Sequence, residues 1–199
     1  MTNEATRIAV AGLLGWRGLA RCLTFGALAF TALLQASADD AWQRIKPGTF
    51  VLFRHALAPG TADPVGFSLG DCATQRNLSA EGRAQALRIG AAFERRRIAV
   101  ETVWSSQWCR TRQTADLAFP GQRVDQAAFN SFFDSPAQGS RQTQAALALM
   151  AASESPGVTV VLTHQVNITA LTGIVPDVGE GVVLRVRGAE LSVLGRIQP

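Results

Sequence analysis

Short apolar runs alternate with amphipathic stretches along most of the chain. The runs at residues 49–53 and 158–163 are mostly apolar, and residues 100–104 form a second predicted strand between them. Such runs are typical of strands whose sheet is covered on both faces. The spacing of apolar residues between them predicts helices at 79–97, with Ser79 as the N-cap, at 109–118, at 141–152, and from His164 to about residue 171.

The remaining segments are a lead-in, a long loop and a closing hairpin. Residues 39–48 form the lead-in, and residues 57–77 are rich in Gly, Pro, Asp and Ser without any periodicity. A short strand at 123–127 and the hairpin 182–186/191–194 complete the pattern. A long irregular loop inside a compact domain usually has a functional role.

Strands and helices that alternate predict an α/β fold, a three-layer sandwich in which a mostly parallel sheet carries helices on both faces. Ligands bind such sheets beyond the carboxyl ends of the strands. Three predicted strands end in Arg54-His55, in Ser105-Ser106 followed by Arg110, and in His164. We expect these side chains to meet at one edge of the sheet.

The charge of the chain comes almost entirely from arginine. The formal net charge is +4, the pI is about 9.7, and Lys46 is the single lysine. Arginine makes forked contacts with carboxylates and phosphates. A nucleic-acid partner is not predicted, because no lysine-rich run or basic stripe interleaved with aromatic residues is present.

The first 38 residues resemble a signal peptide. Arg17 and Arg21 precede an apolar stretch at 22–34, and Ala36-Ser37-Ala38 has the small-x-small pattern of a cleavage site. The stretch is 13 residues long, whereas a membrane-spanning helix needs about 20, so a permanent anchor is disfavoured. Cleavage after Ala38 would leave a single domain at 39–199 in the periplasm or outside the cell.

Two cysteines, Cys72 and Cys109, would remain after this cleavage. In an oxidising compartment they are candidates for a disulfide. The alternative is that both are small buried hydrophobic residues. A metal site is not predicted, because the chain has only two histidines and no Cys-x-x-Cys or His-x-x-x-His spacing.

The expected cluster of two arginines and two histidines suits phosphoryl transfer. Arg54 and Arg110 would hold phosphoryl oxygens by charge-assisted bonds, and a neutral imidazole can attack phosphorus and carry the group. Taken alone, the pair Arg54-His55 fits equally an incidental strand end at which Arg54 reaches solvent. Both histidines and a second arginine after predicted strands favour the functional interpretation.

The motifs resemble those of the histidine phosphatase superfamily, also called the phosphoglycerate-mutase-like fold. Leu52-Phe53-Arg54-His55-Ala56 is similar to its strand followed by Arg-His-Gly, with alanine for glycine. Residues 105–115 resemble its Ser-Ser-x-x-x-Arg-x-x-x-Thr-Ala stretch, and Thr163-His164 its late histidine segment. The resemblance implies that His55 becomes phosphohistidine, that Arg54, Arg110 and His164 bind the phosphoryl group, and that no metal or organic cofactor is needed.

The proton donor departs from the family pattern. Many members place a glutamate where Ser131 stands here, and the nearest carboxylate is Asp134 in Phe132-Phe133-Asp134. Apolar neighbours would raise the pKa of Asp134 and keep it protonated. The alternatives are that Asp134 only caps a loop, or that Glu180 is the donor.

We therefore expect an exported phosphomonoesterase that acts on a small phosphorylated substrate. Its opening motif and signal segment are similar to those of the exported bacterial relatives that dephosphorylate lipopolysaccharide core heptose, which makes a phosphorylated envelope sugar one candidate substrate. The alternative from another class is a non-catalytic phosphate-binding module. The sequence does not determine the oligomeric state.

Overall fold

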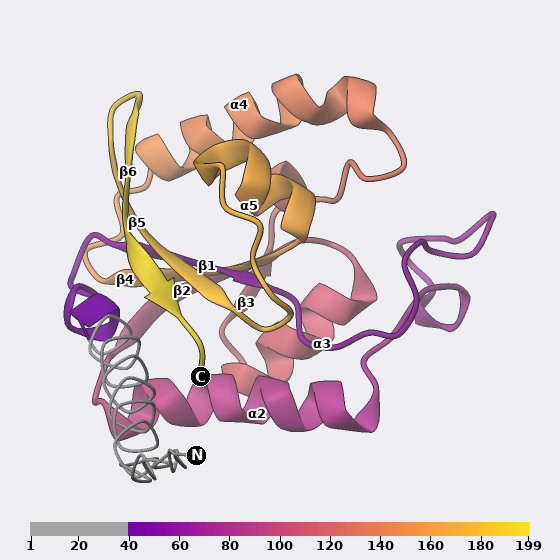
Figure 1. Ribbon diagram of the computed structural model, residues 1–199, viewed down its shortest axis with the longest axis horizontal. Coiled ribbons are helices and arrows are strands. Elements are labelled where there is room, and N and C mark those ends of the chain that lie inside the picture. The colour runs from indigo at the N-terminus through magenta and orange to yellow at the C-terminus, as the bar shows by residue number, and fades with distance from the viewer. Residues whose placement is uncertain (1–39) are drawn as a thin grey trace, which may run out of the picture. The chain divides into compact units, whose positions relative to one another are not determined.

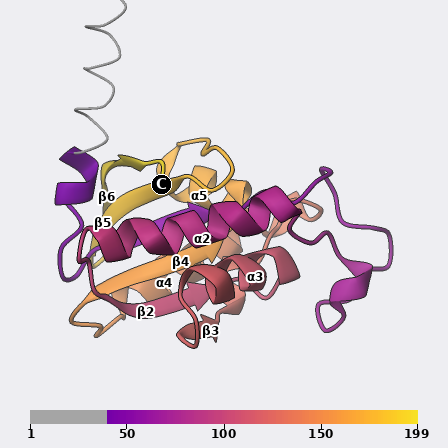
Figure 2. The same cartoon turned by 90° about the horizontal axis from the view of Figure 1, so that it is seen from below.

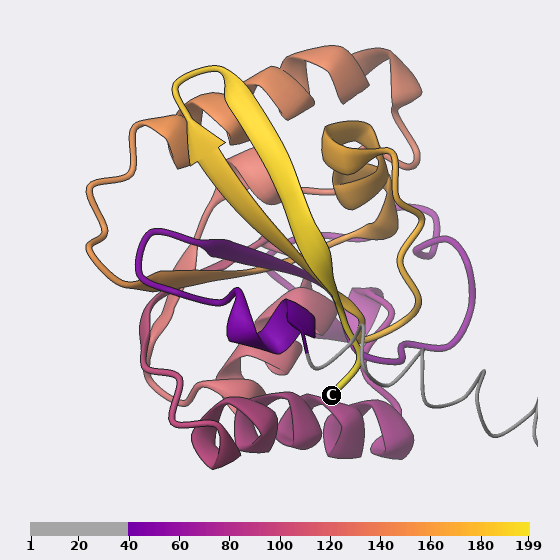
Figure 3. The same ribbon diagram turned by 60° about the vertical axis from the view of Figure 1, so that its left-hand side comes forward.

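A computed structural model describes residues 40–199, which form one six-stranded sheet with the strand order β3-β2-β4-β1-β5-β6. The first four strands along the chain run parallel, and β5 and β6 are antiparallel to their neighbours. The strands are β1 (Phe50–Arg54), β2 (Val100–Ser105), β3 (Arg123–Asp125), β4 (Val158–Thr163), β5 (Gly181–Arg187) and β6 (Glu190–Ile197). Figure 3 shows the long β5–β6 hairpin that closes one side of the sheet.

Helices cover both faces of this sheet. Helices α2 (Ala80–Arg95) and α3 (Cys109–Ala118) lie on one face, and α4 (Gly139–Ala151) and α5 (Gln165–Thr172) lie on the other (Figure 1). Figure 2 shows α2 and α3 side by side in front of the strands. Short 3-10 helices at Cys72–Thr74, Ala127–Phe129 and Pro136–Gln138 interrupt the loops. The predicted three-layer α/β fold is confirmed.

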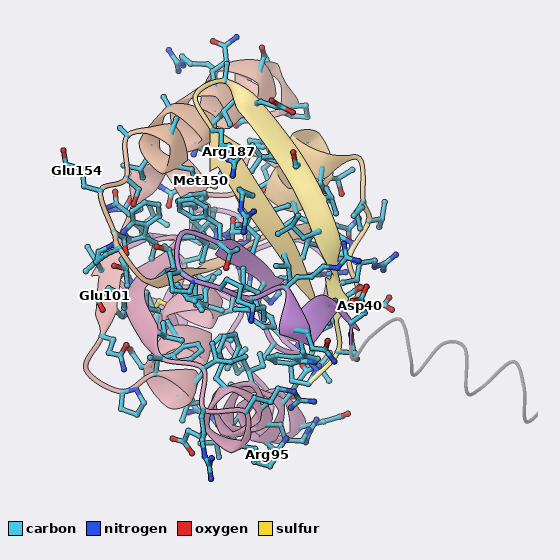
Figure 4. All side chains as sticks on the ribbon, turned by 90° about the vertical axis from the view of Figure 1, so that its left-hand side faces the viewer. Asp40, Arg95, Glu101, Met150, Glu154 and Arg187 are labelled. Atoms are coloured by element: carbon cyan, nitrogen blue, oxygen red, sulfur yellow. A yellow bond between two sulfur atoms is a disulfide. The ribbon has the colours of Figure 1, made fainter. Side chains whose placement is uncertain are left out.

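Alternating side chains of β1 fill two separate cores. Val51 and Phe53 pack with Phe93 of α2, whereas Phe50 and Leu52 pack with residues of α4 such as Met150. Met150 lies between α4 and the sheet in Figure 4, whereas Glu154 points outward. Because both faces of β1 are covered, its sequence is apolar at every position before Arg54.

Close backbone contacts fix α2 against the segments that carry the site. Ser79 caps α2, and its hydroxyl accepts a hydrogen bond from the Gly82 amide. A Cβ atom on Gly82 would lie 2.1 Å from the carbonyl oxygen of Leu57, and one on Gly90 would lie 2.2 Å from that of Ala118. Glycine at these two positions therefore lets α2 approach both the chain after β1 and the end of α3.

The predicted lead-in, residues 39–48, contributes buried side chains to the core in addition to connecting the chain to β1. Residues 40–43 are helical, and Ala41, Trp42 and Ile45 are buried. The Trp42 ring packs edge-on against Phe93 at 5.2 Å, and the Arg96 guanidinium lies 4.2 Å from the Trp42 ring centroid. The prediction of a simple lead-in was wrong here, because the apolar residues of this segment are too few to show a helical period.

A disulfide joins the long loop after β1 to the start of α3. Cys72 and Cys109 form the bond, with their Cα atoms 5.6 Å apart. The loop, at residues 57–77, extends away from the sheet on the right of Figures 1 and 2. Of the two alternatives for these cysteines, the structure contains the disulfide.

The predicted signal segment, residues 1–38, lies outside the described residues. Within residues 40–199, none of the helices combines the length and the apolar character that crossing a membrane requires.

Candidate active site

The carboxyl ends of β1, β2 and β4 bring the predicted residues together. The amide of His55 donates to the carbonyl of Thr163, at 3.0 Å, and the amide of Ser106 donates to that of Leu162, at 2.9 Å. These bonds extend the parallel pairing one residue beyond the strands. The rings of His55 and His164 consequently lie side by side, with centroids 5.5 Å apart.

Arg110 contacts both histidines from the first turn of α3. Its Nε donates to Nε2 of His55, at 3.1 Å, and its Nη2 lies 3.5 Å from Nδ1 of His164. The side chain is buried, with 6% exposed. Burial lowers the pKa of Arg110, opposed by the negative charge of Asp63. The Nε–Nη2 edge of the guanidinium therefore faces the pair of imidazoles.

These residues line a cavity of about 200 Å³. All five side chains for which the sequence predicted a role in catalysis or phosphate binding line this cavity. Its lining consists of Arg54, His55, Gly60, Thr61, Ala62, Asp63, Arg76, Arg110, Ser131, Phe133, Asp134, His164, Gln165 and Val166. The volume and the polar lining suit a small anionic group held at the sheet edge.

The tautomer of His55 follows from its hydrogen bonds. Nδ1 lies 2.8 Å from the carbonyl oxygen of Ala56, which can only accept, so Nδ1 carries the proton. Nε2 is then unprotonated, and its lone pair accepts the hydrogen bond from Nε of Arg110. Burial lowers the pKa of His55 to about 3, and the positive charges of Arg110 and Arg54 act in the same direction. His55 is thus neutral at physiological pH.

His164 is held in the opposite tautomer. A guanidinium can only donate, so the contact with Arg110 favours an unprotonated Nδ1, and Nε2 then donates to the Ser106 hydroxyl at 2.8 Å. That hydroxyl in turn lies 3.4 Å from Oδ1 of Asn130. Burial first, and the charge of Arg110 second, lower the pKa of His164 well below its usual value.

Arg76 is a third arginine in the cavity that the sequence analysis missed. The Nε atoms of Arg54 and Arg76 are buried without a hydrogen-bond partner among the described residues. Nη1 of Arg54 donates to the carbonyl of Pro176, at 3.0 Å, and Nη1 of Arg76 to that of Gly60, at 2.6 Å. Burial lowers the pKa of Arg54, and the nearby charge of Arg76 lowers it further. An anion in the cavity would offset this concentration of positive charge.

Asp63 was missed as well. Its carboxylate accepts from Nη1 of Arg110, at 2.8 and 3.0 Å, from Nε1 of Trp108, at 2.9 Å, and from the amide of Arg76, at 3.2 Å. Burial alone would raise the pKa of Asp63, but the charge of Arg110 and these hydrogen bonds lower it. The only signal in the sequence was the position of Asp63 in the irregular loop that follows the Arg-His pair.

Of the two carboxylates considered as proton donors, only Asp134 reaches the cavity. Asp134 is exposed, and its neighbour Phe133 is 54% exposed, so the expected apolar enclosure is absent. Glu180 is buried and accepts from the Arg196 guanidinium and, at 2.6 Å, from the Asp177 amide. Glu180 is therefore engaged in a structural ion pair, and the role of Asp134 stays a prediction.

No group of three or more histidine, cysteine or acidic side chains suited to a metal ion occurs within residues 40–199. The donor groups that face the cavity are mainly guanidinium and imidazole groups. Guanidinium groups bind anions and do not coordinate metal ions.

A family model agrees with this geometry. The model of the histidine phosphatase superfamily (branch 1) matches residues 50–128. The match includes Arg54, His55 and Arg110 and ends before His164. No curated protein sequence matches the chain.

Solved structures of phosphatases share the fold at low sequence identity. A putative phosphohistidine phosphatase SixA from Agrobacterium tumefaciens is 22% identical, with a TM-score of 0.53 over 77% of this chain and 99% of that one. A phosphoserine phosphatase from Entamoeba histolytica is 12% identical, with a TM-score of 0.57 over 76% and 97%. A putative alpha-ribazole-5'-P phosphatase from Escherichia coli is 14% identical, with a TM-score of 0.55 over 73% and 94%.

Proposed function

We propose that the chain, whose residues 50–128 match the model of the histidine phosphatase superfamily (branch 1), belongs to that superfamily and is a phosphomonoesterase that works through a phosphohistidine at His55. The observation that carries the proposal is the unprotonated Nε2 of His55, which faces the cavity beside Arg110. A neutral imidazole with its lone pair directed at a site built for an anion is a nucleophile ready for phosphorus. Arg54 and Arg76 add positive charge around the same cavity.

In the first step, Nε2 of His55 attacks the phosphorus of a bound monoester. The N–P bond forms as the P–O bond to the leaving group breaks, and the leaving oxygen takes up a proton. The phosphoryl oxygens would replace the imidazoles as acceptors for the Nε–Nη2 edge of Arg110, which releases the Nε2 lone pair for attack. This edge and the guanidinium of Arg54 would then stabilise the negative charge of the transition state. His164 contacts Nη2 on the same edge of Arg110 and would contact the same oxygens.

In the second step, a water molecule attacks the phosphorus of phosphohistidine. A new O–P bond forms as the P–N bond breaks, and the lone pair returns to Nε2. One proton of the water passes to the group that protonated the leaving oxygen, and inorganic phosphate leaves. The bond from Nδ1 of His55 to the Ala56 carbonyl keeps the ring in one orientation through both steps. The tautomer that starts the cycle is therefore also the one that ends it.

Asp134 is the best candidate for the group that protonates the leaving oxygen. It lines the cavity, and Glu180 is engaged with Arg196. A placed acid typically contributes about 10²–10⁴-fold in rate. Aryl phosphates, whose leaving groups need little protonation, should therefore be hydrolysed well even if Asp134 is replaced by asparagine.

We propose a phosphate ester of the cell envelope or exterior as the substrate, with a phosphorylated core sugar as the specific candidate. Two observations support this choice. The N-terminal segment has the pattern of a signal peptide, and Cys72 and Cys109 form a disulfide, a bond that persists mainly in oxidising compartments.

Trapping the intermediate tests the proposed function. The full chain is incubated with a ³²P-labelled aryl phosphate and quenched in alkali. We expect label that is stable in base and lost in acid, and neither label nor hydrolysis in His55→Asn. Turnover by His55→Asn at the wild-type rate would refute the mechanism. Binding of inorganic phosphate by a wild-type protein that hydrolyses none of a panel of small esters would show a binding module instead.

A further inference from the structure

Asp63 is a buried carboxylate in the lining of the cavity, and none of the chemical steps above uses it. Its side chain is 3% exposed, and it is ion-paired with a guanidinium that is itself 6% exposed. A buried charge needs a partner, because removing one member of such a pair leaves an uncompensated charge. The question is whether this carboxylate competes with the phosphoryl group for Arg110 or holds Arg110 in place for it.

The geometry separates the two edges of the guanidinium. Asp63 contacts only Nη1 of Arg110, through both carboxylate oxygens. Nε and Nη2, which form the other edge, face His55 and His164. The edge that would hold phosphoryl oxygens is thus free of the carboxylate. We propose that Asp63 is a positioning residue, which sets the orientation of Arg110 toward the phosphoryl group; this inference rests on the proposed function.

The carboxylate is itself fixed by groups that leave it little freedom. Trp108 donates from Nε1, and the backbone amide of Arg76 donates to Oδ1. Trp108 immediately precedes α3, so the same short segment that presents Arg110 also holds its partner. A carboxylate that has three different donors and is excluded from solvent does not exchange readily with an incoming anion.

Attachments to α3 hold the loop that carries Asp63. The Cys72–Cys109 disulfide joins this loop to the residue before Arg110. The side chain of Gln75 accepts from the amide of Cys109, at 2.9 Å, and Gln113 accepts from that of Leu78, at 3.0 Å. These contacts tie the end of the loop to α3 and so support the placement of Asp63 beside Arg110.

The first test compares Asp63→Asn with Asp71→Asn. Asp71 lies in the same loop, but its carboxylate caps a 3-10 helix through the amide of Ala73. For Asp63→Asn we expect kcat/KM to fall about 10²-fold, as misplacement of a binding group by about 1 Å does, and the affinity for inorganic phosphate to fall. Asp71→Asn should leave both unchanged. Unchanged or tighter phosphate binding by Asp63→Asn would overturn the proposal and indicate that Asp63 blocks the site.

Two further readouts distinguish positioning from other roles. Replacing a positioning residue lowers kcat/KM equally for aryl and alkyl phosphates. Replacing a proton donor lowers kcat/KM mainly for the alkyl phosphate, which has the poorer leaving group. When Arg110 is already replaced by lysine, Asp63→Asn should lower kcat/KM by at most about threefold, because an ammonium has no planar edge to orient. Equal losses in both backgrounds would show that Asp63 acts only on stability.

Measuring the affinity for inorganic phosphate distinguishes failure of this inference from failure of the proposed function. If the wild-type protein binds inorganic phosphate but hydrolyses no ester, the phosphatase proposal fails. Weaker phosphate binding by Asp63→Asn would still support the positioning of Arg110. If wild type hydrolyses esters and Asp63→Asn does so equally well, the positioning role fails alone.

Discussion

The two histidines of this chain allow a direct test of the electrostatics of the site. Both lie in the cavity, and burial together with the neighbouring arginines lowers both pKa values, that of His55 to about 3. At pH 5, an ordinary histidine with a pKa of about 6.5 is about 97% protonated, whereas one with a pKa of about 3 is about 1% protonated. The difference between these two states is large and readily observed.

Nuclear magnetic resonance of ¹⁵N-labelled imidazoles measures this difference. The protein must carry no polyhistidine tag, so that its two histidines are the only imidazoles in the spectrum. We expect both rings to remain neutral from pH 8 down to pH 5. His55 should show the Nδ1-protonated tautomer and His164 the Nε2-protonated one, as their hydrogen bonds require.

A charge substitution provides the control for this experiment. Arg110 lowers the pKa of both histidines, so Arg110→Met should raise both pKa values while the rings stay buried. Titration of the wild-type His55 ring with a midpoint near 6.5 would refute the interpretation of His55 as a neutral nucleophile at low pH. Unchanged titration in Arg110→Met would show that the charge of Arg110 does not contribute to the low pKa values.

Three further predictions concern stability and the support of the site. Between pH 6.5 and about 3, the unfolded chain binds a proton at His55 and the folded chain does not. The free energy of unfolding should therefore rise with pH across this window, by up to about 1.4 kcal/mol per pH unit. In urea titrations, His55→Asn should flatten this slope. Ser106→Ala removes the acceptor for Nε2 of His164 and should lower kcat/KM about tenfold to hundredfold with KM nearly unchanged; a wild-type value would contradict the tautomer. Gly90→Ala should destabilise the fold by about 1–3 kcal/mol or more, measured by urea unfolding, because its Cβ would meet Ala118, whereas Gly70→Ala, with no neighbour closer than 3.9 Å, should not.

The sequence predicted the architecture well because its signals are local. Strands covered on both faces are mostly apolar, as in β1 and β4. Ser79 caps α2 as predicted, and α3 has the predicted bounds of Cys109 and Ala118. The segment at residues 40–45 was the exception, because its packing against Phe93 is a tertiary contact that no local pattern records.

The same logic explains which site residues the sequence located. Arg54, His55 and His164 follow strands directly, and Arg110 lies in the first turn of a helix after a strand, so the topology of a parallel sheet alone brings them together. Asp63 and Arg76 lie 8 and 21 residues beyond His55 in a loop without periodicity. Their positions depend on the course of that loop, which the contacts with α3 determine.

Asp63 and Asp134 illustrate the limit of reasoning from neighbours in sequence. Asp134 was chosen because phenylalanines precede it, yet it is exposed, since two aromatic neighbours cannot bury a carboxylate when the loop turns it toward solvent. Asp63 stands between Ala62 and Pro64 without any sign of burial, yet its side chain is 3% exposed. Burial of a loop carboxylate requires donors from distant segments, here Trp108 and Arg110. The charge balance of this cavity therefore depends on a long-range contact, and a sequence search limited to strand ends finds Arg110 but not its counter-ion.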